Sequence, residues 1–207
     1  YRRLRRRSGA IISMHEFSLP PLEYGTRALW IDIDPAVKEA CDAAGEDFLG
    51  GVHAAAHALL AAAPGHVLCE PAVDVTCEHP NAFQQRPKPL RLVLFDRWAG
   101  GVGVCRALFE CGVGALLGTA LGAVRGCDCG IGCPSCVHDR GCAEFNSVID
   151  KAAGARVLAA AKDRFDASEH AWQEQVRRRQ RQRQRQVPHP VATAPWRAPT
   201  PTVQSVV

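Results

Sequence analysis

Five cysteines crowd into the sixteen residues of the segment CDCGIGCPSCVHDRGC, which runs from position 127 to position 142. Zinc in proteins takes four ligands in a tetrahedron and binds thiolates at about 2.3 Å. Cys133-Pro-Ser-Cys136 has the C-x2-C spacing of a zinc knuckle. The neighbouring glycines give the backbone the freedom that tight metal-binding loops need. The segment therefore predicts a structural Zn²⁺ site.

The choice among the five cysteines depends on their spacing. Cys129 lies four residues before the knuckle, and Cys142 lies six residues after it. A C-x-C pair can hardly place both sulfurs on one zinc ion without strain, so we expect one of Cys127 and Cys129 to lie outside the site. The predicted ligands are Cys129, Cys133, Cys136 and Cys142, with Cys127 as the alternate ligand.

The alternatives to a zinc site are disulfides, a redox pair and an iron–sulfur cluster. Disulfides need an oxidising compartment, and nothing in the sequence signals export. A redox C-x-x-C pair normally opens a helix after a strand, whereas Cys133 lies in a loop rich in glycine and cysteine. An iron–sulfur cluster would use the same thiolates and would be coloured. The remaining cysteines are scattered, as small core residues are: Cys41, Cys69, Cys77, Cys105 and Cys111.

Two further motifs offer weaker chemistry. His53 and His57 are spaced i and i+4, but Ala54 stands where a metalloprotease needs its glutamate, so we favour two core histidines. Gly100-Gly101-Val102-Gly103 precedes an expected helix, where backbone amides can cradle a phosphate. No Gly-Lys pair of a phosphate-binding loop occurs in the chain. The glycines therefore favour a tight turn, with a contact to the DNA backbone as the alternative.

The basic residues concentrate at the two ends of the chain. The whole sequence has 25 Lys and Arg against 21 Asp and Glu, a net charge of +4. Residues 8–176 contain 13 of the basic residues and all 21 acidic ones, a net of −8. This distribution excludes a uniformly basic nucleic-acid-binding protein. The opening arginines are the predicted nucleic-acid contacts: Arg2, Arg3, Arg5, Arg6 and Arg7.

The strands and helices around these residues are predicted from the spacing of apolar residues and from turn residues. Strands are predicted in Tyr1–Phe17 (two), Thr26–Ile33, His66–Glu70 and Leu90–Phe95, with a loop over Pro71–Pro89. Helices are predicted at Pro35 to about Ala44, Glu46–Ala63, about Val104–Val124 and about Asn146–Phe165. The fold class is therefore α/β or α+β, a small mixed sheet flanked by helices, with a cysteine-rich zinc loop and a terminal helix.

The domain organisation follows from composition. Residues 1–170 are predicted to form one zinc-binding domain with its zinc loop at 127–142. Residues 171–207, rich in Arg, Gln and Pro, are predicted to form a disordered tail. Phe48–Cys69 contains no Asp, Glu, Lys or Arg, but Pro64-Gly65 and three histidines favour a buried helix over a membrane span.

Taken in order, these motifs resemble the MrfA-type zinc-binding domain. The segments that carry the resemblance are Tyr1–Arg7, Leu19-Pro20-Pro21-Leu22-Glu23, Thr26–Ile33, His57-Ala-Leu-Leu60, Leu94-Phe95-Asp96, Gly100–Gly103, Leu108-Phe109-Glu110, Cys129-x3-Cys133-Pro-Ser-Cys136-Val137, Cys142, Asn146 and Asp150-Lys151-Ala152-Ala153. The resemblance covers about residues 1–165. Where the family commonly has Cys-Gly-Asn-x-Asn, this chain has Cys142-Ala-Glu-Phe-Asn146.

This domain is the carboxy-terminal domain in a family of superfamily 2 DEAD/DEAH-box DNA helicases. The resemblance implies 3′–5′ unwinding and repair of crosslinked or alkylated DNA. The chain has no Walker A motif and no Asp-Glu-x-x box, so we expect it neither to hydrolyse ATP nor to unwind DNA alone. It begins with Tyr1, and its only methionine is Met14, as expected for the carboxy-terminal fragment of such an ATP-dependent helicase.

The alternative is a free-standing zinc-dependent module that binds nucleic acid or protein without a motor. The expected partner is DNA, reached through the motor lobes of a longer parent chain, with no membrane and no small-molecule substrate. The expected location is intracellular, in the nucleus if the source is a eukaryote and otherwise in the cytoplasm.

Overall fold

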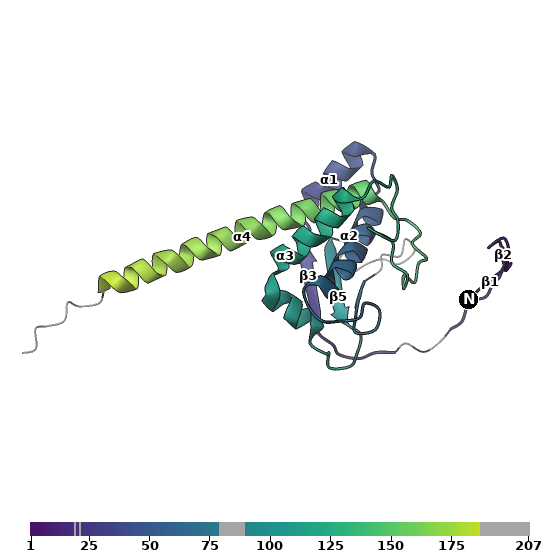
Figure 1. The fold of residues 1–207 in the computed structure, drawn as a ribbon, viewed down its shortest axis with the longest axis horizontal. Helices are drawn as coiled ribbons and strands as arrows, with labels where there is room; N and C mark the ends of the chain where they lie inside the picture. The colour runs from purple at the N-terminus through teal and green to yellow at the C-terminus, as the bar shows by residue number, and fades with distance from the viewer. Residues whose placement is uncertain (19, 21, 79–89, 187–207) are drawn as a thin grey trace, which may run out of the picture. The chain divides into compact units, whose positions relative to one another are not determined.

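The computed structural model describes residues 1–207 apart from 19, 21, 79–89 and 187–207 (Figure 1). The chain divides into two units, residues 1–162 and 163–207. The first unit contains a three-stranded sheet, a separate hairpin and packed helices. The expected combination of a small sheet, flanking helices and a cysteine-rich loop is confirmed.

The sheet has the strand order β3-β5-β4, and both of its ladders are antiparallel. Its strands are β3 (Ala28–Asp32), β4 (Val75–Cys77) and β5 (Arg91–Asp96). Leu29 pairs with Leu94 and Ile31 with Leu92, so these side chains point to one face. Burial alternates along β5, as expected for a sheet that is covered on that face.

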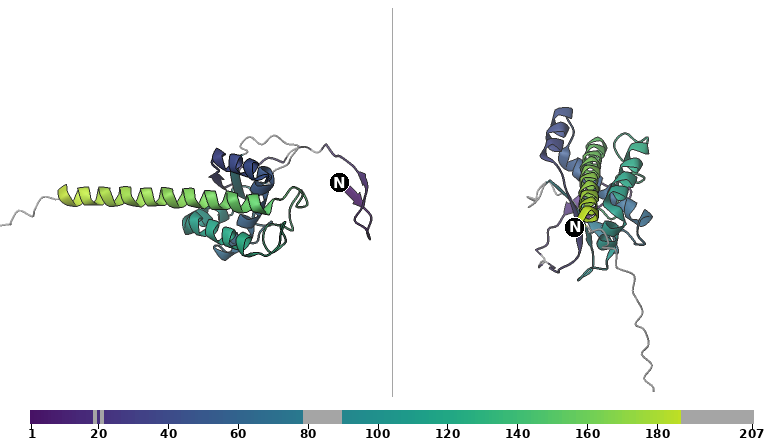
Figure 2. Two further views of the ribbon diagram at one scale, coloured as in Figure 1. Left: turned by 90° about the horizontal axis from the view of Figure 1, so that it is seen from above. Right: turned by 90° about the vertical axis from the view of Figure 1, so that its left-hand side faces the viewer.

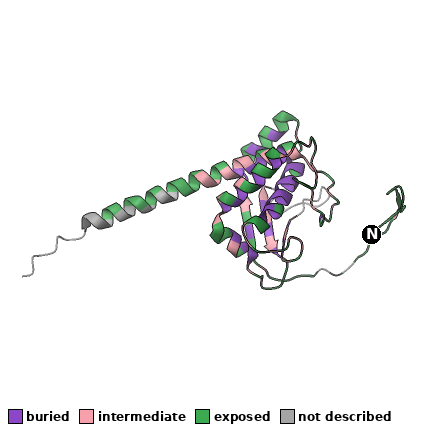
Figure 3. Cartoon of the chain, in the orientation of Figure 1, coloured by how far each residue is buried: buried purple, intermediate pink, exposed green. Residues whose placement is uncertain are grey.

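Two helices, α2 (Phe48–Ala62) and α3 (Val104–Gly126), contact this sheet and pack against each other (Figures 1 and 2). Nearly every residue of α2 is buried, which makes it the central helix of the first unit (Figure 3). Gly51 lies against Ala153, and Gly154 lies against Ala54, with no room for a side chain at either glycine. This close approach joins α2 to the start of α4 (Lys151–Gln186).

The helix starts follow capping rules. Asp34 caps α1 (Pro35–Ala44) by accepting a hydrogen bond from the Ala36 N–H, and the helix begins at Pro35 as the sequence predicts. Asp47 caps α2 in the same way, and its own N–H donates to the Asp150 carboxylate at 2.9 Å. Asp150 also accepts from the Ala153 N–H. One carboxylate thus ties the beginnings of two helices together.

The first residues form a hairpin, β1 (Arg2–Leu4) paired antiparallel with β2 (Ile11–Met14). Gly9 in the turn has a φ of 65°, a conformation that favours glycine. The two short strands predicted in this segment are confirmed.

One strand was predicted in the wrong place. His66–Glu70 follows the short helix η1 (Ala63–Gly65) as turn and irregular chain, because the His66 and Val67 N–H groups both bond to the Ala63 carbonyl. The third strand is instead β4, which lies within the predicted loop. Its pairing with β5 depends on contacts distant in sequence, which a local apolar pattern does not show.

The last helix differs from its prediction at both ends. It begins at Lys151 rather than near Asn146, because Phe145, Asn146 and Val148 have φ values of 56°, 55° and 57°, outside the helical region. It continues to Gln186, so the disorder predicted from residue 171 is absent as far as that residue. Arg and Gln are good helix formers, and Glu174 pairs with Arg178 at i and i+4. The predicted tail beyond 186 lies outside the described residues.

Among the described residues, two helices are long and apolar enough to cross a membrane by length and composition alone. The apolar stretch Phe48–Gly65, which includes α2, is 72% buried inside the fold, as expected for a core helix. The stretch that forms α3 is 39% buried.

Candidate metal centre

Four cysteine sulfurs converge in the loop between α3 and α4. They belong to Cys127, Cys129, Cys133 and Cys136, and all lie within 4.8 Å of one another. The Sγ–Sγ distance is 3.5 Å from Cys127 to Cys133, 3.4 Å from Cys129 to Cys136 and 3.7 Å from Cys133 to Cys136. A tetrahedron with Zn–S bonds of about 2.3 Å has sulfurs about 3.8 Å apart. The donor set therefore fits one Zn²⁺.

The knuckle is formed by a tight turn. The Cys133 carbonyl accepts hydrogen bonds from the N–H groups of Cys136, Val137 and His138 at 3.0–3.1 Å. Gly132 precedes the turn with a φ of 121°, and a side chain there would meet Val137 at 2.6 Å. Only glycine fits this position, which explains the Gly-Cys-Pro-Ser-Cys sequence in structural terms.

A lysine fixes the other half of the loop. Lys151 Nζ donates hydrogen bonds to the carbonyl oxygens of Cys127 at 2.5 Å and Cys129 at 2.6 Å. These carbonyls belong to the C-x-C pair, and Lys151 is the first residue of α4. The loop is thus attached to α4 independently of any metal.

The thiols differ in their readiness to ionise. Hydrogen bonds to the sulfur lower the pKa of Cys133 to about 7, and the largest contribution comes from the Ser135 N–H. Burial raises the pKa of Cys136 to about 12. Zinc binds thiolates, so metal binding must release protons from this loop.

The structure brings together three of the predicted ligands, Cys129, Cys133 and Cys136, with Cys127 as the fourth sulfur. From the C-x-C spacing we expect one of Cys127 and Cys129 to lie outside the site, but both sulfurs belong to this group. Cys127 has an extended backbone, φ −90° and ψ 126°, and residues i and i+2 of an extended chain point to the same side. Cys142 is not in this group, because its sulfur lies 3.3 Å from His53 Nε2.

Four thiolates saturate a tetrahedral ion and leave no position for water or substrate. Such an ion acts as a crosslink and performs no chemistry. Here it would connect the residues just after α3 to the loop before α4. The chain carries a structural zinc centre.

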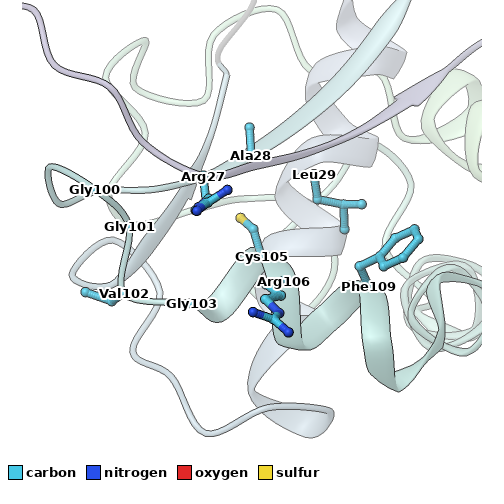
Figure 4. Close-up of a pocket in the computed structure, with 10 residues that line it drawn as sticks. All are labelled: Arg27, Ala28, Leu29, Gly100, Gly101, Val102, Gly103, Cys105, Arg106 and Phe109. Carbon is cyan, nitrogen blue, oxygen red and sulfur yellow. The ribbon is translucent and has the colours of Figure 1, made fainter.

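The glycine loop forms a groove of about 600 Å³ with Arg27, Arg106 and Phe109 (Figure 4). The buried Asp96 carboxylate accepts hydrogen bonds from the N–H groups of Gly103 at 2.7 Å and Cys105 at 2.9 Å. Burial opposes ionisation of Asp96, but these hydrogen bonds outweigh it and lower its pKa. Because Asp96 occupies the amides of Gly103 and Cys105, these two are not available to a phosphate, as the tight-turn interpretation expects.

The predicted nucleic-acid contacts lie on the N-terminal hairpin. Arg2, Arg3, Arg5, Arg6 and Arg7 are all exposed. The Arg2 guanidinium lies 5.1 Å from the centre of the Phe145 ring, in the segment that follows the zinc loop. The hairpin therefore presents a cluster of positive charge.

Sequence reasoning missed three features. Lys151 was recognised only as part of a motif, although a lysine at a helix start after a cysteine loop could have suggested a carbonyl anchor. No role is predicted for Asp96 from the sequence, although a carboxylate near a helix start can accept hydrogen bonds from the unpaired N–H groups there. No local signal connects His53 and His57 with Cys142, which lies more than eighty residues away.

Comparisons with known proteins agree with this geometry. Residues 55–137 match the family model described as the MrfA Zn-binding domain, a stretch that includes all four clustered cysteines. The ATP-dependent helicase HRQ1 of Saccharomyces cerevisiae is 30% identical over 72% of this chain. The ATP-dependent helicase hrq1 of Schizosaccharomyces pombe is 27% identical over 61% of it.

Among solved structures, the DUF1998 helicase MrfA bound to DNA is 20% identical over 77% of this chain and 20% of its own, with a TM-score of 0.47. This chain spans only 14% and 13% of the length of the two yeast helicases.

Proposed function

We propose that this chain, whose residues 55–137 match the MrfA Zn-binding domain, is the zinc-stapled accessory domain of an ATP-dependent DNA helicase. The observation that carries the proposal is the convergence of four cysteine sulfurs inside the stretch that matches the family model. The two yeast relatives are ATP-dependent helicases, and this chain spans only a small part of the length of each. The motor would lie elsewhere in the parent protein.

In this proposal the zinc ion fixes the relative positions of three elements. Cys127 directly follows α3, and Lys151 holds the Cys127 and Cys129 carbonyls at the start of α4. The start of α4 in turn packs on the central helix α2 through Gly51 and Gly154. The metal would therefore keep a rigid surface in place against the motor and its DNA.

The arginine hairpin is the proposed DNA contact. Five exposed arginines lie within seven residues, whereas residues 8–176 carry a net charge of −8. Each phosphate that an arginine neutralises steepens the salt dependence of the logarithm of the binding constant by about 0.9. The contact would be to the DNA backbone and independent of sequence.

The experiment is DNA binding of the zinc-loaded chain over a range of salt concentrations. We expect replacement of Arg3, Arg5 and Arg6 by Gln to weaken binding and to reduce the salt slope by about 2 to 3. The matched control replaces three basic residues on other elements, Lys38, Arg106 and Arg164, by Gln. Equal loss in both triple variants, or none in the hairpin variant, would contradict the proposed contact.

We also propose that the parent unwinds DNA in the 3′–5′ direction and acts in repair. This follows from the family resemblance. The test is strand displacement by the parent protein on duplexes with a 3′ or a 5′ single-stranded tail, where only the 3′-tailed substrate should open.

Free thiolate ligands suit a reducing, intracellular compartment, which we propose as the location of the protein.

A further inference from the structure

A second cluster of metal-binding side chains lies in the core, separate from the four-cysteine site. It consists of His53, His57 and Cys142, whose potential ligand atoms lie within 4.8 Å of one another. The three residues are 1%, 2% and 7% exposed. Both histidines lie on α2, and Cys142 is the last residue of the zinc loop, ahead of the segment that leads to the start of α4 at Lys151. The fold thus brings one nitrogen–sulfur donor set together from distant parts of the chain.

The hydrogen bonds of the two imidazoles orient them as metal ligands. His57 Nδ1 lies 2.8 Å from the Val137 carbonyl oxygen, and His53 Nδ1 lies 3.3 Å from the Val148 carbonyl oxygen. A carbonyl oxygen only accepts, so each Nδ1 must carry the proton. In a neutral imidazole, Nε2 then has the lone pair. Metal-bound histidines are commonly held by this arrangement, in which the other ring nitrogen donates to a carbonyl.

The sulfur of Cys142 also has defined hydrogen-bond partners. It accepts a hydrogen bond from the Asn146 N–H at 3.3 Å and lies 3.3 Å from His53 Nε2. Asn146 is itself fixed by two hydrogen bonds with the backbone of Asp139, at 2.8 and 2.9 Å.

The backbone around this cluster is strained. Val148, which supplies the carbonyl to His53, has a φ of 57°, an uncommon conformation for a β-branched residue. Phe145 and Asn146 have similar values. Such conformations persist only where the surrounding contacts impose them, and they concentrate at ligand sites.

We propose that His53, His57 and Cys142 bind a second Zn²⁺ ion, through the Nε2 atoms of the two histidines and the Sγ atom of Cys142. Two imidazoles and one thiolate suit zinc, which takes mixed nitrogen and sulfur ligands, and a water molecule would supply the fourth ligand. They would also suit copper, but copper sites of this type usually add a methionine sulfur, and the only methionine, Met14, lies in the hairpin. On binding, the Cys142 thiol loses its proton to solvent. The ion would join the central helix α2 to the segment that leads into α4.

Metal content and ligand type of the full chain test the proposal. We expect two zinc ions per chain after purification without chelator, and X-ray absorption should show about two to three sulfurs per zinc together with imidazole. One zinc per chain with four sulfur neighbours would overturn the second site and leave the first intact. A second ion that elemental analysis identifies as copper would also overturn the proposal.

Variants then assign each ion to its cluster. Cys142→Ser and His53→Gln should each reduce the zinc content from two to one and remove the imidazole signal. Cys133→Ser should disrupt the four-sulfur site, and Cys111→Ser, at an exposed cysteine outside both clusters, should keep both ions. Two ions retained in both Cys142→Ser and His53→Gln would overturn the proposal. If those variants fail to fold, the stoichiometry and absorption spectrum of the unmodified chain decide.

Discussion

At the scale of single residues, the identity of the fourth cysteine ligand matters most. The sulfur of Cys127 lies 3.5 Å from that of Cys133, while Cys142 faces His53. We predict that Cys127→Ser destroys the four-sulfur site and lowers the zinc content by one ion, because a neutral hydroxyl is a poor replacement for a thiolate. Elemental analysis checks this, with Cys111→Ser as the control. A full zinc content in Cys127→Ser would show that Cys127 is not a ligand.

Protonation of the same thiols makes zinc binding depend on pH. Cys133 has a pKa of about 7 and Cys136 a pKa of about 12 without metal, so protons compete with zinc throughout the neutral range. We predict that zinc affinity falls as pH falls, by more than about tenfold per pH unit below about pH 7, since several thiols must ionise. Competition with a chromophoric chelator at several pH values measures this. A pH-independent affinity would exclude thiolate ligands.

At the scale of elements, two glycines determine how closely α2 and α4 approach. A β-carbon on Gly51 would lie 2.5 Å from the Ala153 side chain, and one on Gly154 would lie 2.7 Å from Ala54. We predict that Gly51→Ala lowers the free energy of unfolding by about 1–3 kcal/mol through overpacking. Gly122→Ala in α3 is the matched control, because a β-carbon there would meet no atom within 4 Å beyond the backbone of its own helix, and alanine favours helix by up to about 1 kcal/mol. Denaturant unfolding compares them, and equal stability of both variants would refute the close crossing.

The start of α3 depends on one buried carboxylate. Asp96 is fully buried and accepts N–H groups of Gly103 and Cys105, which lower its pKa. A lowered folded-state pKa gives stability that is present above the unfolded pKa and lost as pH falls through the folded value. We predict that Asp96→Asn costs about 1–3 kcal/mol at neutral pH and weakens the pH dependence of stability in acid. The exposed Asp42→Asn variant is the control, and an equal loss in both would contradict this role.

At the scale of the whole molecule, the zinc loop and the core belong to one compact unit, residues 1–162. The loop contacts α4 through Lys151, and α4 packs on α2. We predict that a strong chelator lowers the thermal unfolding midpoint of the chain and that added Zn²⁺ restores it, because metal binding is coupled to folding. Scanning calorimetry with and without chelator measures the effect. An unchanged midpoint in zinc-depleted protein would show that the metal is not structural.

The zinc loop, the start of α1 at Pro35, the strand β5 and the family resemblance were all predictable from the sequence alone. Each of these depends on a local pattern: cysteine spacing, a capping side chain before a helix, or an apolar run. The third strand was predicted wrongly, because the pairing of β4 with β5 is a contact across distant segments.

Which sulfurs meet depends on the folded chain. The extended backbone at Cys127 turns its side chain toward Cys133, and the left-handed residues after Cys142 hold that sulfur against α2. The same packing brings His53 and His57 to Cys142 across more than eighty residues of chain. The sequence shows which ligands are near one another along the chain, whereas coordination requires atoms that are near in space. The packing of α2 against the loop sets the distances between the histidine nitrogens and the Cys142 sulfur.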